Sequence, residues 1–294
     1  MNDTARNPLG IHAQVWTGDW SEASCRMAVA KSAAAGYDVL EMPALDPERI
    51  DAAMTRAVLE EAGLDVVVSL GLSFDADISS DDPEVAARGE QRLQSALRLT
   101  REVGGSYLGG VLYSALGKYG APLTARGREH CVAALRRLAE EAAAADVTLG
   151  LETVNRYETH VVNTARETVT LIDDIGADNV MVHLDTYHMN IEEGDLDRPV
   201  RECGDRLGYV HVGESHRGYL GSGTVDFPVF FRALTAVGYT GIIAFESFSS
   251  AVVAPTLSNS LGVWRNLWDD GEDLAAHARG FIVDQLRAAR ASAR

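Results

Sequence analysis

Four side chains that can bind a metal ion recur along the chain, each at or near the end of a short apolar, β-branched run. They are Glu152, Asp185, His211 and Glu246, and 33, 26 and 35 residues separate them in that order. Each interval has room for one loop, one helix and the next strand, which is the length of a βα unit. Three carboxylates and one imidazole suit Mn²⁺, Mg²⁺ or Co²⁺ better than they suit a thiolate-bound zinc ion. We therefore expect one divalent cation site at which these four groups meet.

A cation held in this way suggests a reaction at a carbon next to a carbonyl. Four protein ligands leave about two positions of an octahedral ion open, and the paired oxygens of an α-hydroxyketone would fill them. The cation then polarises the carbonyl, so the neighbouring C–H becomes acidic. Glu152 and Glu246 are expected to act as base and acid on opposite sides of the substrate, with no organic cofactor.

Other polar and aromatic side chains close to the expected site are candidates for holding the substrate. His188 and Arg217 follow the runs that carry Asp185 and His211, where they can stabilise negative charge as it develops on oxygen. Glu158 can bind a hydroxyl group or orient a neighbour. Trp20 and Tyr113 can wall a sugar pocket, although aromatic residues of this kind more often pack in a core.

The wider pattern alternates strand and helix from one end of the chain to the other. A parallel sheet whose two faces are both buried is typically built from apolar strands such as these. Eight strands, each followed by a helical segment, predict one α/β domain over residues 1–294, a (β/α)₈ TIM barrel with a C-terminal helical region. The active sites of such barrels lie at the C-terminal ends of the strands, where the four candidate ligands fall. The strands are expected at 10–16, 38–42, 64–70, 106–113, 147–152, 179–185, 207–212 and 241–245.

Composition narrows the class of ligand. The 294 residues carry a net charge of −17, which disfavours nucleic acid and anionic membrane surfaces as partners and leaves a small neutral substrate. The three cysteines are widely spaced and include no C-x-x-C pair, so we expect reduced thiols. The first residues have no apolar signal core, and no apolar run has the length of a membrane span. These observations favour a cytoplasmic protein.

A glycine-rich stretch at 215–223 follows the seventh expected strand, a place where many barrels bind phosphate. Arg217 is the only lysine or arginine in that stretch, so a phosphorylated substrate is disfavoured. The stretch 264–268 has a tryptophan at each end. It is expected to pack the last helix against the barrel or against a partner subunit.

Several long motifs resemble those of the ketose 3-epimerases, the group of D-tagatose, D-allulose (D-psicose) and L-ribulose 3-epimerases within the xylose-isomerase-like barrels. The resemblance runs from Gly10 to about Arg265. It implies reversible inversion at C3 of a free ketose through a cis-enediolate, a Mn²⁺, Mg²⁺ or Co²⁺ ion, and a homodimer or homotetramer. It also places metal ligands at Glu152, Asp185, His211 and Glu246, the catalytic pair at Glu152 and Glu246, and substrate contacts at Glu158, His188 and Arg217. The motifs are ETVNRYE at 152–158, LDTYHMNIEE at 184–193, HVGESHR at 211–217, FESF at 245–248 and GVWR at 262–265.

Two positions depart from the pattern of some members of that family, which have an aromatic residue in place of His12 and a tryptophan in place of Tyr113. Both are expected to line the region that holds the distal carbons of the sugar. The stretches at 113–115 and 215–221 are similar to the D-allulose 3-epimerases of actinobacteria. The resemblance therefore implies D-fructose/D-allulose first, followed by L-ribulose/L-xylulose or D-tagatose/D-sorbose. The alternatives are an aldose–ketose isomerase on the same barrel, a metal-dependent endonuclease, which the acidic charge disfavours, and a non-catalytic sugar-binding protein.

Overall fold

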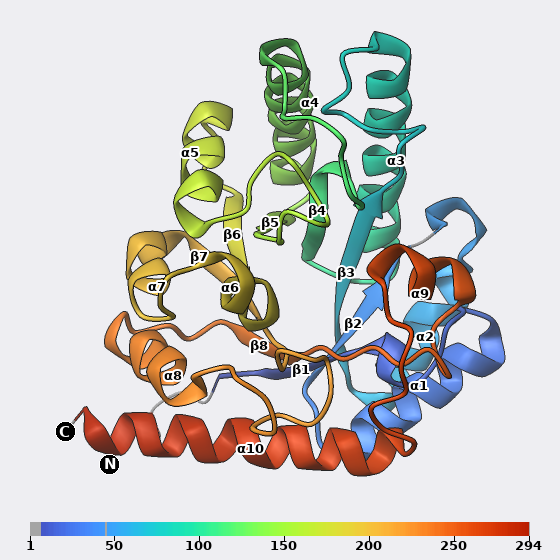
Figure 1. Cartoon of the computed structure of the whole chain (residues 1–294). Helices are drawn as coiled ribbons and strands as arrows, with labels where there is room; N and C mark the ends of the chain where they lie inside the picture. Colours follow the sequence, from blue (N-terminus) through green and yellow to red (C-terminus); the bar gives the residue numbers. More distant parts are fainter. Residues whose placement is uncertain (1–6, 45, 294) are drawn as a thin grey trace.

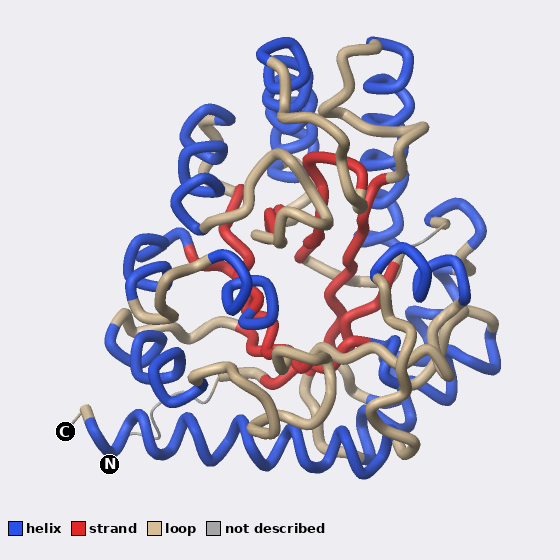
Figure 2. Tube along the Cα trace, viewed as in Figure 1, coloured by secondary structure: helices blue, strands red, loops and turns tan. Residues whose placement is uncertain are grey.

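Eight parallel strands form a closed barrel in the computed structural model, which describes residues 7–44 and 46–293 (Figures 1 and 2). Each strand pairs with the next along the chain, and β8 pairs with β1. The predicted (β/α)₈ barrel is confirmed. The strands are β1 (Leu9–His12), β2 (Val39–Pro43), β3 (Asp65–Leu72), β4 (Tyr107–Ala115), β5 (Thr148–Glu152), β6 (Val180–Asp185), β7 (Leu207–Val212) and β8 (Ile242–Phe245).

The helices surround the ring of strands, as Figure 2 shows in blue around red. Short 3₁₀ turns lie at η1 (Ala13–Val15), η2 (Pro47–Arg49) and η3 (Gly204–Arg206). The helices are α1 (Glu22–Ala34), α2 (Ala52–Ala62), α3 (Pro83–Glu102), α4 (Ala125–Ala143), α5 (Ala165–Ile175), α6 (Thr186–Glu192), α7 (Arg198–Cys203), α8 (Phe227–Ala236), α9 (Pro255–Leu261) and α10 (Gly271–Ser292).

Polar side chains begin the principal helices, as their sequence pattern predicts. Asp82 accepts a hydrogen bond from the Glu84 amide at the start of α3, and Thr124 accepts one from the Gly127 amide at the start of α4. Thr164 forms a reciprocal capping box at the start of α5. Such caps satisfy amide groups that have no partner within the helix.

The two largest departures from the sequence prediction lie near the C-terminal ends of the strands. The first strand was expected to reach residue 16, but it ends at His12, whose Nδ1 accepts the Gln14 amide and begins a 3₁₀ turn. Helix α6 was not predicted at all. It begins directly after β6 because Asp185 ends the strand and its carboxylate also accepts the Tyr187 amide at 2.7 Å.

The N-terminal part of the barrel interior is closed by its own side chains. The rings of Tyr107 and Tyr209 stack with their centroids 5.0 Å apart, and Val39, Val67 and Ala244 pack around them. A Cβ atom at position 150 would lie 1.9 Å from the Tyr107 hydroxyl, so only glycine fits there. This layer forms a floor, and the polar side chains of the barrel gather above it.

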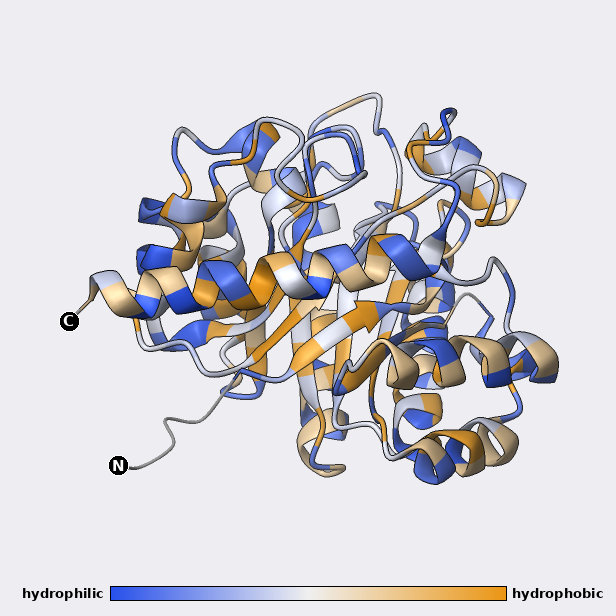
Figure 3. Ribbon diagram, turned by 90° about the horizontal axis from the view of Figure 1, so that it is seen from below, coloured by the Kyte–Doolittle hydropathy of each residue, from blue (hydrophilic) through white to orange (hydrophobic). Residues whose placement is uncertain are grey.

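The last helix packs along the outside of the barrel. Helix α10 packs against α8, and the Ala275 carbonyl accepts a hydrogen bond of 2.9 Å from the Tyr37 hydroxyl. Figure 3 shows α10 crossing in front of the hydrophobic strands, with polar and apolar residues mixed along its length. Within 7–44 and 46–293, none of the helices combines the length and the apolar character needed to cross a membrane. The three cysteines are buried and unpaired, as predicted.

Candidate active site

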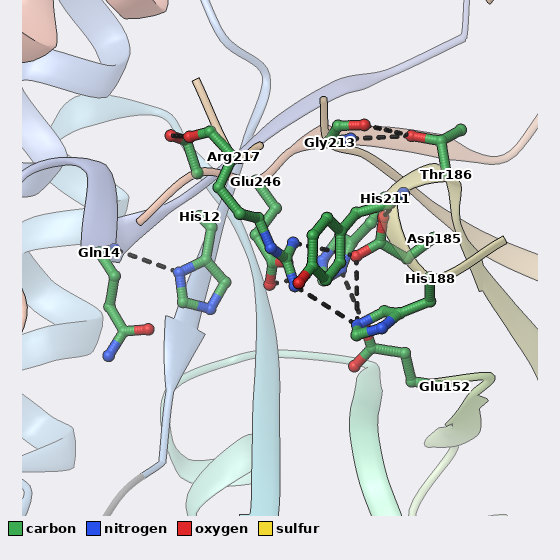
Figure 4. Close-up of polar contacts among 12 residues, drawn as sticks. His12, Gln14, Glu152, Asp185, Thr186, His188, His211, Gly213, Arg217 and Glu246 are labelled. Carbon is green, nitrogen blue, oxygen red and sulfur yellow. Dashed lines mark hydrogen bonds and ion pairs between the residues drawn. The ribbon is translucent and has the colours of Figure 1, made fainter. Parts of the chain in front are cut away.

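The barrel brings the four candidate metal ligands together above the floor. Glu152 and Asp185 end β5 and β6, His211 lies opposite Asp185 in the register of β6 and β7, and Glu246 follows β8 directly. One ligand atom from each of the four lies within 4.8 Å of the others, and all four side chains are buried (Figure 4). A group of three oxygen donors and one nitrogen donor fits a hard divalent cation of the Mn²⁺ or Mg²⁺ type.

The orientation of His211 favours the same interpretation. Its Nε2 lies 2.6 Å from a Glu41 carboxylate oxygen, which also accepts the Tyr209 hydroxyl at 2.8 Å. Its Nδ1 faces Glu152 at 3.3 Å and Glu246 at 3.5 Å. A carboxylate on the far nitrogen is the arrangement that commonly orients a metal-binding histidine. Glu41 therefore supports the cluster from behind.

Burial shapes the charges of the cluster. It raises the pKa of Glu152 to about 8 and that of Asp185 to about 6, because water is excluded from both carboxylates. Burial also opposes ionisation of Glu246, but Arg217 and His211 lower the pKa of that carboxyl overall. His211 is buried as well, yet Glu41 and Glu246 raise its pKa well above the usual range. Acidic groups crowded in this way are stabilised by a bound cation.

The three expected substrate contacts lie beside the cluster. Arg217 Nη1 forms ion pairs with Asp185, at 3.1 Å, and with Glu246. His188 Nε2 lies 3.6 Å from Asp185 and 3.9 Å from both Glu152 and Glu158. The His188 Nδ1 accepts the Asn155 backbone amide, and burial lowers the pKa of the ring well below its usual value. A neutral His188 thus presents its Nε2–H to the cavity.

The loop that carries Arg217 is held by a buried carboxylate. Glu214 accepts hydrogen bonds from the backbone amides of Ser215, Gly221 and Val225, at 2.8, 2.9 and 3.3 Å. Two amides of the glycine-rich stretch, those of Ser215 and Gly221, therefore already contact the chain's own carboxylate. Arg217 has a φ of 62°, a left-handed conformation that is uncommon outside glycine and asparagine.

A cavity opens above the cluster, but two of the expected aromatic contacts do not line it. The Tyr113 hydroxyl donates to the Glu152 carbonyl at 2.5 Å, behind the ligand, and its ring is completely buried. Trp20 donates to Thr55 at 3.1 Å and lines a separate hollow between the loops after β1 and β2. The spacing of residues along a strand did not show which way these rings point.

His12 lines the cavity as expected, together with residues that the sequence did not single out. Gln14, Phe248, Leu257 and Leu261 also contribute to its wall. Gln14 lies in the turn that ends β1 early, and the two leucines belong to α9, so no strand-end rule would have found them. His183 lies deeper, with its ring edge against His211 at a centroid distance of 4.2 Å.

The sequence matches the family model of the xylose isomerase-like TIM barrel over residues 29–289. It is 52% identical over 277 residues to the L-ribulose 3-epimerase of Methylomonas sp. (strain DH-1), covering 94% of this chain and 97% of that protein. It is 48% identical over 280 residues to a ketose 3-epimerase of Arthrobacter globiformis, covering 95% and 97%.

Solved structures give the same result. The crystal structure of a D-allulose 3-epimerase from Methylomonas sp. in complex with D-allulose matches with a TM-score of 0.94 and 50% identity, over 97% of this chain and 99% of that chain. A structure of an L-ribulose 3-epimerase matches with a TM-score of 0.95 and 44% identity, over 98% and 97%. The similarity thus extends over nearly the full length of both partners.

Proposed function

Because the chain belongs to the ketose 3-epimerases of the xylose isomerase-like TIM barrel family and is therefore an isomerase, we propose that it interconverts D-fructose and D-allulose with a bound Mn²⁺ ion. The observation that carries this proposal is the buried group of Glu152, Asp185, His211 and Glu246. Mg²⁺ and Co²⁺ are the alternative ions. L-Ribulose/L-xylulose and D-tagatose/D-sorbose are the next substrates, and the names of the relatives support both L-ribulose and D-allulose.

We assign the proton transfers to two carboxylates. A cation held by the four ligands would polarise the ketose carbonyl and make the C3 hydrogen more acidic. Glu152 and Glu246 come from β5 and β8 and reach the substrate from different strands of the barrel. One carboxylate takes the C3 proton, and the bonding electrons pass into a cis-enediolate. The other gives a proton to C3 from the opposite face, so that the configuration inverts and no atom is gained or lost.

The remaining polar groups would bind the C1 end of the sugar. Arg217, His188 and Glu158 stand together on one side of the cluster, where a cation and two hydrogen-bonding groups can hold the hydroxyl and developing negative charge beside C2. Burial raises the pKa of Glu158 to about 7, so this group can donate as well as accept near neutral pH.

An aldose–ketose isomerase of the same superfamily would move a proton between C1 and C2, and isotope incorporation separates the two reactions. We expect the metal-free protein, reloaded with Mn²⁺ and incubated with D-fructose in D₂O, to place deuterium at C3 while D-allulose appears. The measurement is NMR after removal of the paramagnetic ion, with heat-inactivated protein as the control. Deuterium at C1 with formation of an aldose would contradict the proposal and establish an isomerase.

We also propose a homodimer or homotetramer in the cytoplasm, with a small free sugar as its ligand and neither nucleic acid nor membrane as a partner. Trp264 supports the oligomer, because its side chain is 76% exposed beside α9 while Trp268 is buried against Ser247. A large exposed aromatic side chain is typical of an interface. Sedimentation velocity at micromolar concentration should show no monomer; a monomer would refute the oligomer. The unpaired, buried cysteines are consistent with a reducing compartment.

A further inference from the structure

His183 is a buried histidine that the proposed reaction does not use. It lies on β6 opposite Glu152 of β5, two residues before Asp185, and it is 1% exposed. Side chains two residues apart on a strand point to the same face, so His183 lies one layer below Asp185 inside the barrel. The rings of Tyr209 and His211 pack against it, with centroid distances of 4.7 and 4.2 Å. The imidazole is therefore held in one place beside the cluster.

Neither nitrogen of this imidazole has a hydrogen-bond partner within residues 7–44 and 46–293. A neutral imidazole carries one N–H donor and one nitrogen lone pair. Leaving such a buried group unpaired costs about 1–3 kcal/mol. A histidine that only fills space at this depth is expected to have at least one partner, because most buried polar side-chain atoms do. The unpaired nitrogens of His183 therefore point to a ligand that this ring can bind.

His183 belongs to a second group of side chains with the spacing of metal ligands. One ligand atom each of Glu152, His183 and His211 lies within 4.8 Å of the others. Two imidazoles and one carboxylate form the kind of set that holds zinc with a fourth position open to water. The four-ligand group has three carboxylates and one imidazole, which suit Mn²⁺ or Mg²⁺ better. The two groups thus favour different metals, although they share two side chains.

The shared histidine allows only one of the two groups to hold a cation at a time. His211 Nε2 lies 2.6 Å from a Glu41 carboxylate oxygen, whereas Nδ1 faces Glu152 at 3.3 Å. Nδ1 is therefore the nitrogen that serves a cation in either position, and its one lone pair binds one ion. A cation bound beside His183 thus excludes a cation from the four-ligand group.

We propose that Glu152, His183 and His211 form a second cation site, which selects Zn²⁺ and, when filled, excludes Mn²⁺ from the four-ligand group. The zinc ion binds two imidazole nitrogens and one carboxylate oxygen, and a water molecule completes its four ligands. Asp185 and Glu246 take no part in this site. Its effect on catalysis rests on the proposed function: zinc holds Glu152 one layer below the reacting sugar, so epimerisation stops.

Two substitutions with opposite effects test the site. His183→Phe keeps an aromatic ring but removes both nitrogens. It should weaken Zn²⁺ binding by about 100-fold or more, because even an outer partner of a metal site is worth about 10–100-fold. Its Mn²⁺ affinity should stay close to that of wild type. Asp185→Asn should do the reverse and weaken Mn²⁺ while Zn²⁺ is retained.

Calorimetric titration of the metal-free proteins measures both affinities. The matched control is His277→Phe on α10, outside the barrel interior, which should leave both affinities unchanged. Wild type provides two further readouts. Zn²⁺ added to the Mn²⁺-loaded protein should release Mn²⁺, seen as the EPR spectrum of the free ion. X-ray absorption at the zinc edge should show two imidazole ligands on the bound ion.

The site would be overturned by unchanged Zn²⁺ affinity in His183→Phe, by a single imidazole on the bound zinc, or by an equal loss of both ions in Asp185→Asn. Zn²⁺ and Mn²⁺ bound together in one chain would overturn the exclusion. If His183→Phe does not fold, the zinc spectrum of wild type and the two affinities of Asp185→Asn decide. None of these measurements requires turnover. Zinc bound in this way to a protein that does not invert C3 would refute the proposed function and leave the site standing.

Discussion

Replacing Glu246 with glutamine is expected to lower the rate of epimerisation by about 10³-fold or more, because an amide cannot accept the C3 proton. The side chain keeps its shape and one oxygen that can face a cation. The loss should therefore appear in kcat, while Mn²⁺ still binds in a calorimetric titration. A surface carboxylate provides the matched control: Glu60, paired with Arg56 on α2, should tolerate glutamine without effect.

The same variant tests whether two carboxylates work on opposite faces. Glu152 remains in Glu246→Gln and can still exchange the C3 proton that lies on its side. In D₂O, one of the two sugars, D-fructose or D-allulose, should slowly gain deuterium at C3 without inversion, and the other should not. Equal exchange into both sugars would mean that a single group serves both faces. Unchanged epimerisation would remove Glu246 from the reaction altogether.

Stripping the protein with EDTA is expected to abolish activity, and adding Mn²⁺ should restore it. A bound cation would polarise the ketose carbonyl more strongly than a hydrogen bond can, and the metal-free protein lacks that effect. The binding site for the ion is formed by Glu152, Asp185, His211 and Glu246. The measurement is epimerisation before stripping, after stripping and after reloading, with Mg²⁺ and Co²⁺ as alternative ions. Full activity in metal-free protein, verified by elemental analysis, would contradict the metal requirement.

The free energy of unfolding of the same metal-free protein should decrease as pH rises. Burial raises the pKa of Glu152 to about 8 and of Asp185 to about 6, and neighbouring carboxylates raise that of His211. All three folded groups bind protons more tightly than in the unfolded chain, so each loses stability as pH rises from its ordinary pKa to its raised pKa. For Asp185 the interval is from 3.8 to about 6 and for Glu152 from 4.5 to about 8, while His211 begins to contribute above its ordinary value of 6.5. The loss between pH 6 and 8 therefore comes from Glu152 and His211. Each group contributes at most about 1.4 kcal/mol per pH unit.

Thermal melting provides the readout. The Tm of the metal-free protein should fall as pH rises from 6 to 8, by about 2–4 °C for each kcal/mol lost. Mn²⁺ should raise the Tm by an amount that grows over the same interval, because fewer protons then compete with the ion. Glu246 has a lowered pKa and acts at lower pH, outside this window. A Tm that rises from pH 6 to 8 without metal would contradict the charge arrangement.

The C-terminal ends of β5 to β8 were predictable because parallel strands bury both faces, so each apolar run stops where polar side chains begin. Glu152 and Asp185 end their strands where the apolar runs stop, and the barrel places His211 and Glu246 beside them. The β period of two then fixes which side chains point inward. The meeting of four ligands therefore follows from local sequence and from the closure of eight strands, with no long-range information.

The direction of side chains and the geometry of loops were harder to predict from the sequence. Tyr113 was expected in the sugar pocket, but its hydroxyl turns to the Glu152 carbonyl, a contact that no spacing rule encodes. Gln14 reaches the cavity only because His12 ends β1 early and begins a turn. Arg217 points toward the cluster because its backbone is left-handed. Glu214 stabilises the loop that carries Arg217 by accepting a hydrogen bond from the Gly221 amide. The first of these contacts joins residues 39 positions apart, whereas the other two lie within turns whose geometry the strand and helix periods do not describe.

The tyrosine floor of the barrel determines where substrate enters and product leaves. Tyr107 and Tyr209, with Val39, Val67 and Ala244, close the interior beneath the ligands. A sugar that has entered from the loop side must leave by the same mouth, since the barrel offers no exit through its far end. Substrate and product therefore share a single opening, and the product must leave before the next substrate molecule can enter.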